Sequence, residues 1–251
     1  MENILLPFIM FCMIAFVGIA IYLGQKVTAH HRSTDMRKFA RASGMTYLEQ
    51  GNPEKINTLK SLFIGSQGDN IEVTNLIQGE IQGVPVEIFD FKFFPSVGLD
   101  TSRYQSTVVE FPAPPLMPAF TIRRKRLFEQ TLRALDGDSP LKVPNLDGLE
   151  TNLEVYGEAV ELIEPYITAD LMRALDRIIE LTVESDGERI YFSIYPHGVE
   201  DIDKMPQFVS LVYKIHTHFF SGEMTESEVK PFALTKGTGK IRFSRPLAHS
   251  G

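Results

Sequence analysis

The stretch NIEVTNLIQGEIQGVPVEIFDFKFF, residues 70–94, sets the fold class of this chain. Apolar and polar residues alternate on both sides of Gln82-Gly83, and glycine supplies the positive φ that tight hairpin turns require. Folding the chain about this dipeptide brings the apolar positions of both arms onto one face. The predicted pairs are Ile81 with Val84, Gly79 with Val86, and Ile77 with Ile88. The stretch therefore predicts a long antiparallel hairpin.

One polar residue breaks the apolar second arm of this hairpin. Asp90 lies between Phe89 and Phe91, in a segment that is apolar on both faces. An unpaired carboxylate is costly to bury, so we expect Asp90 to have a partner, either an arginine or backbone amides. A structural role for Asp90 is favoured over a catalytic one.

Other segments alternate or repeat in ways that predict further strands and helices. Strands are expected at residues 45–48, 104–111, 119–123 and 153–155, and helices at 34–44, 56–63, 127–135, 158–164, 168–178 and 204–220. A second hairpin is expected about the turn Asp186-Gly187. Its predicted pairs are Ile179 with Ile194, Leu181 with Phe192, Val183 with Ile190, and Glu184 with Arg189.

These elements predict an α+β fold in which a single N-terminal transmembrane helix is followed by antiparallel sheets with packed helices. The stretch 136–148 contains two prolines and two glycines and indicates a boundary between two lobes, residues 29–135 and 149–220. A single continuous sheet remains the alternative. Residues 221–251 lose all periodicity, which predicts a mobile tail.

Residues 1–28 are the predicted transmembrane anchor and its flank. Residues 4–23, ILLPFIMFCMIAFVGIAIYL, contain no charged side chain, and a helix of this length rises about 30 Å, enough to cross a bilayer. No basic residue precedes this run and the run is long, so it is not a typical cleaved signal peptide. The residues that follow it are rich in lysine and arginine. The positive-inside rule then predicts a single-pass protein of the bacterial inner (plasma) membrane, with the N-terminus outside and the C-terminal domain in the cytoplasm.

Composition and motifs exclude several functional classes. The formal net charge of −7 argues against a nucleic-acid binder, whose domain is normally basic. The sequence contains no phosphate-binding loop, dinucleotide glycine fingerprint or nucleophile elbow, so we assign no catalytic or cofactor-binding residue. The only cysteine, Cys12, lies within the predicted span, and the histidines lack the spacing of metal ligands on helices, so we assign no metal site.

The densest cationic run is Arg123, Arg124, Lys125 and Arg126. One interpretation is a contact with anionic lipid headgroups or with a phosphate-bearing ligand, since each cation near an anionic membrane surface contributes about 1 kcal/mol. The alternative is a solvated strand end.

The order of these features resembles a group of uncharacterised bacterial single-pass membrane proteins. The resemblance is carried by the anchor, the basic helix ending at Gly44-Met45, and three later motifs, Gly83-Val84-Pro85-Val86 with Phe89-Asp90-Phe91, Thr107-Val108-Val109, and Pro118-Ala119-Phe120-Thr121-Ile122-Arg123. It implies a membrane-tethered cytosolic domain without an assigned activity.

The favoured function is a non-enzymatic, membrane-tethered interaction or scaffolding module that faces the cytosol. Its expected partners are the lipid bilayer, through residues 4–23, and a membrane or cytosolic protein. One alternative is a sensor that binds a small anionic or lipid molecule, and another is a membrane-bound hydrolase that uses acidic residues. The oligomeric state is left open.

Overall fold

The computed structural model describes residues 13, 16, 27, 29–66, 68–95, 104–125, 139–178, 180–194 and 198–221. Outside these ranges lie Arg126, the predicted helix at 127–135, the predicted tail after residue 221, and the predicted span at 4–23 except for residues 13 and 16. Within the described ranges, no helix is both long and apolar enough to cross a membrane.

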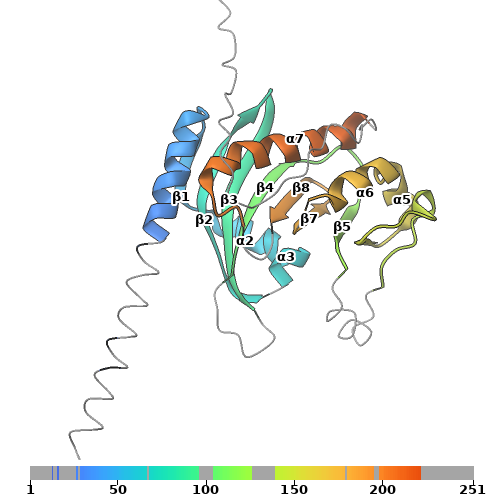
Figure 1. Ribbon diagram of the computed structural model, residues 1–251, viewed down its shortest axis with the longest axis horizontal. Coiled ribbons are helices and arrows are strands. Elements are labelled where there is room, and N and C mark those ends of the chain that lie inside the picture. The colour runs from blue at the N-terminus through green and yellow to red at the C-terminus, as the bar shows by residue number, and fades with distance from the viewer. Residues whose placement is uncertain are drawn as a thin grey trace, which may run out of the picture.

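The described strands form one eight-stranded antiparallel sheet with the order β1-β2-β3-β4-β8-β7-β5-β6 (Figure 1). The strand bounds are β1 Thr46–Gln50, β2 Gly68–Ile81, β3 Val84–Pro95, β4 Tyr104–Pro112, β5 Ala119–Arg124, β6 Leu153–Gly157, β7 Leu181–Asp186 and β8 Arg189–Ile194. The α+β class and the antiparallel pairing are thus as the sequence predicts.

The long hairpin at residues 70–94 has the predicted register. The three pairs Ile81 with Val84, Gly79 with Val86 and Ile77 with Ile88 all occur between β2 and β3. Gln82 and Gly83, at the turn, have φ angles of 52° and 81°. Positive φ at both central residues is the geometry that matches the twist of the flanking strands.

The hairpin of β7 and β8 has a different register from the one predicted, shifted by two residues. Leu181 pairs with Ile194, and Glu184 faces Tyr191 rather than Arg189. The cause is the side chain of Asp186, whose Oδ1 accepts hydrogen bonds from the amides of Glu188 at 2.9 Å and Arg189 at 2.7 Å. Asp186 is therefore the residue before the turn, and Gly187, with a φ of 93°, is the first residue of the turn.

The two predicted lobes share this one sheet, so the single-sheet alternative describes the protein. β4, from the first predicted lobe, pairs with β8 from the second. β5 lies between β7 and β6, both of which come from the second predicted lobe. The proline- and glycine-rich segment before β6 returns the chain to the edge of the sheet instead of separating two bodies.

Helices cover both faces of the sheet (Figure 1). Their bounds are α2 Pro53–Lys60, α3 Phe63–Ser66, α5 Val160–Ile163, α6 Ala169–Asp176 and α7 Met205–Ser221, with short 3₁₀ turns η1 Pro144–Leu146, η2 Glu164–Tyr166 and η3 Ile202–Lys204. Residues 29–42 form a further helix at the start of the described chain. This helix packs with α6 and α7 into the larger core, on the face that carries Ile88. α2 and α3 cover the opposite face, which carries Phe89, through a smaller core that contains Leu59 and Ile64.

The helix ends follow the sequence closely. Helix 29–42 is followed by Gly44, whose φ of 70° lets the amide of Met45 reach the carbonyl of Ala40 at 2.8 Å. This is the Schellman arrangement, in which a left-handed glycine ends a helix. At the start of α6, the hydroxyl of Thr168 accepts a hydrogen bond from the amide of Leu171 at 3.2 Å and so caps the helix that is predicted to begin at this residue.

Candidate functional site

Asp90 is completely buried in β3, and its partner is an arginine, one of the two kinds of partner that its sequence context predicts. Arg32 of helix 29–42 donates from Nε to Oδ2 of Asp90 at 3.0 Å and from Nη2 to Oδ1 at 2.9 Å. The side chain of Arg32 is itself only 11% exposed. Such two-pronged, charge-assisted contacts are the stronger kind of hydrogen bond. The pair fixes helix 29–42 directly onto the sheet.

Further polar groups complete this network, which we call the Arg32 clamp: Arg32, Asp90, Asn75, Tyr47, Thr107 and the carbonyl of Val199. The amide of Asn75 donates to Asp90 at 2.8 Å, and Tyr47 donates to Asn75 at 2.8 Å. Arg32 also donates to the Val199 carbonyl at 2.7 Å and to the Thr107 hydroxyl at 3.2 Å. Donors occupy both carboxylate oxygens of Asp90, which compensates the buried charge. This arrangement fits the structural role expected for Asp90.

Asn75 reaches the clamp because β2 is irregular at this point. The register of β2 against β3 shifts between Thr74 and Ile77. Asn75, within the shift, has a φ of 56°, a conformation that asparagine tolerates better than most residues. The bulge therefore directs a polar side chain toward Asp90.

A second ionic cluster lies on the opposite face, between α2 and the sheet. Glu110 is buried on β4, and Lys55 of α2 places Nζ at 2.5 Å from its Oε2. Lys55 also pairs with Glu87, and Arg189 pairs with Glu110. Burial acts to raise the pKa of Glu87, but hydrogen bonds from Lys55 and Gln78 outweigh it, so the pKa is lowered. The cluster anchors α2 to the sheet.

Glu184 of β7 is a buried carboxyl that the sequence analysis does not single out as a site. It is 1% exposed, and it accepts hydrogen bonds from the amides of Phe63 at 2.5 Å and Ile64 at 3.1 Å, at the start of α3. Burial raises the pKa of Glu184 to about 7, although the two backbone hydrogen bonds act in the opposite direction. Glu184 therefore holds α3 on the sheet and titrates near neutral pH.

The cationic run 123–126 is divided by the fold. Arg123 is only 5% exposed, with its guanidinium carbon 3.7 Å from the ring centroid of Phe63 and 4.2 Å from that of Tyr156. Arg124 forms an ion pair with Asp176 at 3.2 Å. Lys125 is exposed and donates to the carbonyl of Thr151 at 2.9 Å, while Arg126 lies outside the described residues. The predicted contact with an anionic surface stays a prediction, with Lys125 as its exposed described member.

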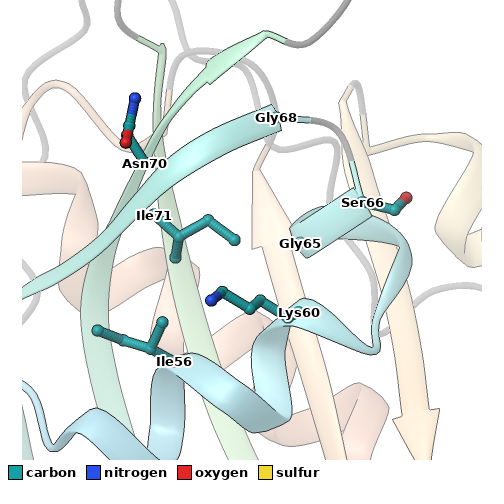
Figure 2. Close-up of a pocket in the computed structure, with 7 residues that line it drawn as sticks. All are labelled: Ile56, Lys60, Gly65, Ser66, Gly68, Asn70 and Ile71. Carbon is teal, nitrogen blue, oxygen red and sulfur yellow. The ribbon is translucent and has the colours of Figure 1, made fainter.

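A cavity of about 590 Å³ lies between α2, α3 and the start of β2. Its lining residues are Ile56, Lys60, Gly65, Ser66, Gly68, Asn70 and Ile71. Figure 2 shows the side chains of Ile56, Lys60 and Ile71 extending into the same space. The cavity thus has a mainly polar lining that includes the ammonium group of Lys60, and Ile56 and Ile71 contribute its apolar side chains.

Two glycines shape this cavity because they lie against neighbouring backbone. A Cβ at Gly65 would be 1.9 Å from the carbonyl oxygen of Leu59, and a Cβ at Gly68 would be 2.0 Å from that of Phe94. Neither contact is possible for a larger residue without backbone movement, so the α2–α3 corner and the β2–β3 pairing depend on glycine here.

The two histidines of α7 have structural neighbours. His216 Nε2 lies 2.8 Å from the carbonyl oxygen of Pro112, and burial lowers the pKa of His216. His218 Nε2 lies 3.2 Å from the hydroxyl of Thr168. Within the part of the chain that the structure describes, no three side chains of the metal-binding types come together.

No protein-family model matches this sequence, and no curated protein matches it. Among solved structures, the chain is similar to the crystal structure of the mycobacterial trehalose monomycolate transport factor A. The two share 12% sequence identity with a TM-score of 0.48, and the match covers 75% of this chain and 92% of that one.

Proposed function

We propose that this chain is a membrane-tethered interaction or scaffolding module without catalytic activity, which faces the cytosol from the bacterial inner membrane. Residues 4–23 would form the anchor, and the lysine- and arginine-rich residues after them would stay on the cytosolic side. The proposal places the chain among single-pass proteins of the kind that its motifs resemble.

The observation that carries this proposal is the Arg32 clamp. Arg32 comes nine residues after the end of the apolar run, at residue 23. Its contacts with Asp90 and with the Val199 carbonyl join the first described helix to the sheet by buried, charge-assisted hydrogen bonds. A body joined in this way to the segment that follows an anchor would be held close to the membrane. There it could present a surface to neighbours in or near that membrane.

The net charge of the whole chain supports the same proposal. The net charge of −7 disfavours lying flat against an anionic inner leaflet. The surfaces of the domain would then remain accessible to protein partners.

The test compares two arginines of the same helix in the full chain. Proteins crosslinked to the chain in native membranes are compared for wild type, Arg32→Ala and the control Arg41→Ala, whose side chain is exposed. We expect all three forms to fractionate with membranes. Only Arg32→Ala should lose the proteins that crosslink to the wild type or crosslink to different ones. An identical set for Arg32→Ala, or a reporter after Gly251 that is active only in the periplasm, would contradict the proposal.

A second candidate function is a sensor for a small anionic or lipid molecule, and the cavity beside α3 favours it. Lys60 supplies a positive charge, and Ile56 and Ile71 supply apolar contact. A ligand at 100 times its Kd would stabilise the folded chain by about 2.7 kcal/mol. The test screens anionic metabolites for a rise in melting temperature of the full chain, which Lys60→Ala should abolish and the exposed control Lys214→Ala should keep. No rise for any anion tested would count against a sensor.

A further inference from the structure

Three large apolar side chains, each more than half exposed, lie in or near the loop that joins β4 to β5. Leu116 in this loop is 96% exposed, Leu162 of α5 is 60% exposed, and Phe220 near the end of α7 is 55% exposed. We call this surface the apolar end: Leu116, Leu162 and Phe220.

Contacts with the β4–β5 loop place the three side chains at the same end of the sheet. Tyr166, just after α5, donates to the carbonyl of Pro115 at 3.4 Å. His216 of α7 is bonded to the carbonyl of Pro112, and its ring lies 5.0 Å from that of Phe220. The turn η2, which follows α5, therefore contacts the loop, and the last turns of α7 lie against the end of β4 that leads into it.

Leu116 is held in an unfavourable conformation as well as exposed. Its φ is 67°, in the left-handed region, which costs a non-glycine residue about 1–2 kcal/mol. The loop is fixed on both sides of it, because Ala113 donates to the carbonyl of Glu188 at 2.8 Å and Met117 is buried. A leucine that is strained, fixed and almost fully exposed indicates that something binds there.

Carboxylates border this surface. Glu161 and Glu164 lie on α5 and η2, next to Leu162, and Glu188 lies on the β7–β8 turn against which the loop is bonded. Glu161 and Glu188 are exposed. The complementary occupant is a segment that combines apolar side chains with positive charge. An anionic bilayer has the wrong charge for this role.

The end of this chain has that composition. Residues 229–251, VKPFALTKGTGKIRFSRPLAHSG, contain five lysine and arginine residues and no aspartate or glutamate, in a chain whose net charge is −7. Their large apolar side chains are those of Phe232, Leu234, Ile241, Phe243 and Leu247.

The geometry also favours this segment, because α7 ends at Ser221, immediately after Phe220. Only residues 222–228 separate the helix from the basic segment, and seven residues can span up to about 25 Å. The segment thus begins within reach of Leu116 and Leu162. A separate protein would have no comparable local concentration.

We propose that residues 229–251 of this chain bind to the apolar end of the same molecule, with their apolar side chains on Leu116, Leu162 and Phe220 and their cations near Glu161, Glu164 and Glu188. The proposal requires neither the membrane anchor nor a partner protein, so it stands or fails separately from the proposed function.

The test places a photo-crosslinking benzoyl-phenylalanine at residue 116 or 162 of the full chain in native membranes, with Asn57, exposed on α2, as the control position. Mass spectrometry identifies the crosslinked peptide, and co-expressed copies with heavy and light isotopes separate contacts within one molecule from contacts between copies. We expect positions 116 and 162, and not 57, to crosslink to residues 229–251 of the same copy. Crosslinks to lipid, to another protein or to a second copy, or none above the control, would overturn the proposal.

Charge reversal provides the second arm. Glu161→Lys with Glu164→Lys should lower the crosslinking yield from residue 116 about tenfold, because two attractive contacts become repulsive. Adding Lys236→Glu and Lys240→Glu to this form should restore the yield. Glu49→Lys with Glu80→Lys, which reverses two exposed acids near the far edge of the sheet, is the matched control and should change nothing. Equal crosslinking yields for Glu161→Lys/Glu164→Lys and for the control Glu49→Lys/Glu80→Lys would also overturn the proposal. An unchanged melting temperature verifies that each form is folded.

Discussion

Replacing Arg32 by alanine tests the clamp most directly. The substitution removes four hydrogen bonds, two to Asp90 and one each to the Val199 carbonyl and the Thr107 hydroxyl. It also leaves Asp90, which is 0% exposed, without its counter-charge. Breaking a buried pair by removing one partner costs about 3–5 kcal/mol, mostly because the remaining charge is buried alone. For a domain of this size, such a loss lowers the melting temperature by about 10 °C.

The assay is thermal unfolding of the full chain in detergent, with Arg41→Ala as the control and the Arg32→Ala/Asp90→Asn double variant as the third form. Arg41 is exposed on the same helix, so its loss should change the free energy of unfolding by no more than about 0.5 kcal/mol. The double variant should recover part of the loss, because the buried site then carries no charge. A shift for Arg32→Ala no larger than that for Arg41→Ala would refute the reasoning.

Three further substitutions have defined outcomes. The pKa of Glu184 is about 7 in the folded chain against an ordinary value of 4.5, so the folded chain binds this proton more tightly than the unfolded chain does. The free energy of unfolding should therefore fall by about 3 kcal/mol as pH rises from 4.5 through 7. In Glu184→Gln the urea midpoint should change less with pH across this window, and a pH dependence equal to that of the wild type would contradict the assignment. Gly68→Ala would place a Cβ 2.0 Å from the Phe94 carbonyl oxygen and should destabilise the chain by about 2 kcal/mol in urea unfolding, so a neutral effect would show that β2 starts elsewhere. Thr168→Ala should cost about 1 kcal/mol in the same assay through loss of the α6 cap, whereas Thr168→Ser should cost much less, and equal losses would rule out capping as the cause.

Local pattern predicted local structure well in this chain. The β2–β3 register followed from apolar alternation and from a glycine where the turn needs positive φ. The β7–β8 register was predicted wrongly because apolar alternation fits two registers that differ by two residues equally well. The Asp186 side chain decides between them through its bonds to two amides. Single-sequence periodicity does not report such a contact.

Long-range arrangement was much less accessible from sequence. That Asp90 needs a partner follows from its position between two phenylalanines, but nothing local identifies Arg32, 58 positions earlier, as that partner. Arg123 belongs to a run that looks solvated, yet the fold places it between two aromatic rings. Glu184 was predicted to face Arg189, and nothing in the sequence indicated its actual partners because these are backbone amides, which every sequence contains. The joining of the predicted lobes depends on strand pairs that only the folded chain reveals.

The pairing of β4 with β8 has a consequence during synthesis. The hydroxyl of Ser106 on β4 donates a hydrogen bond to the carbonyl of Ile194 on β8, 88 positions later. During synthesis, β4 is therefore made before its neighbour β8 exists. At about 5–20 residues per second, synthesis of the intervening residues takes roughly 4–18 seconds. For this interval the apolar edge formed by Val108, Val109 and Phe111 is open to pairing with other nascent chains. We therefore expect slower elongation between codons 112 and 194 to increase aggregation of this protein, and chaperone contact during the same interval to reduce it.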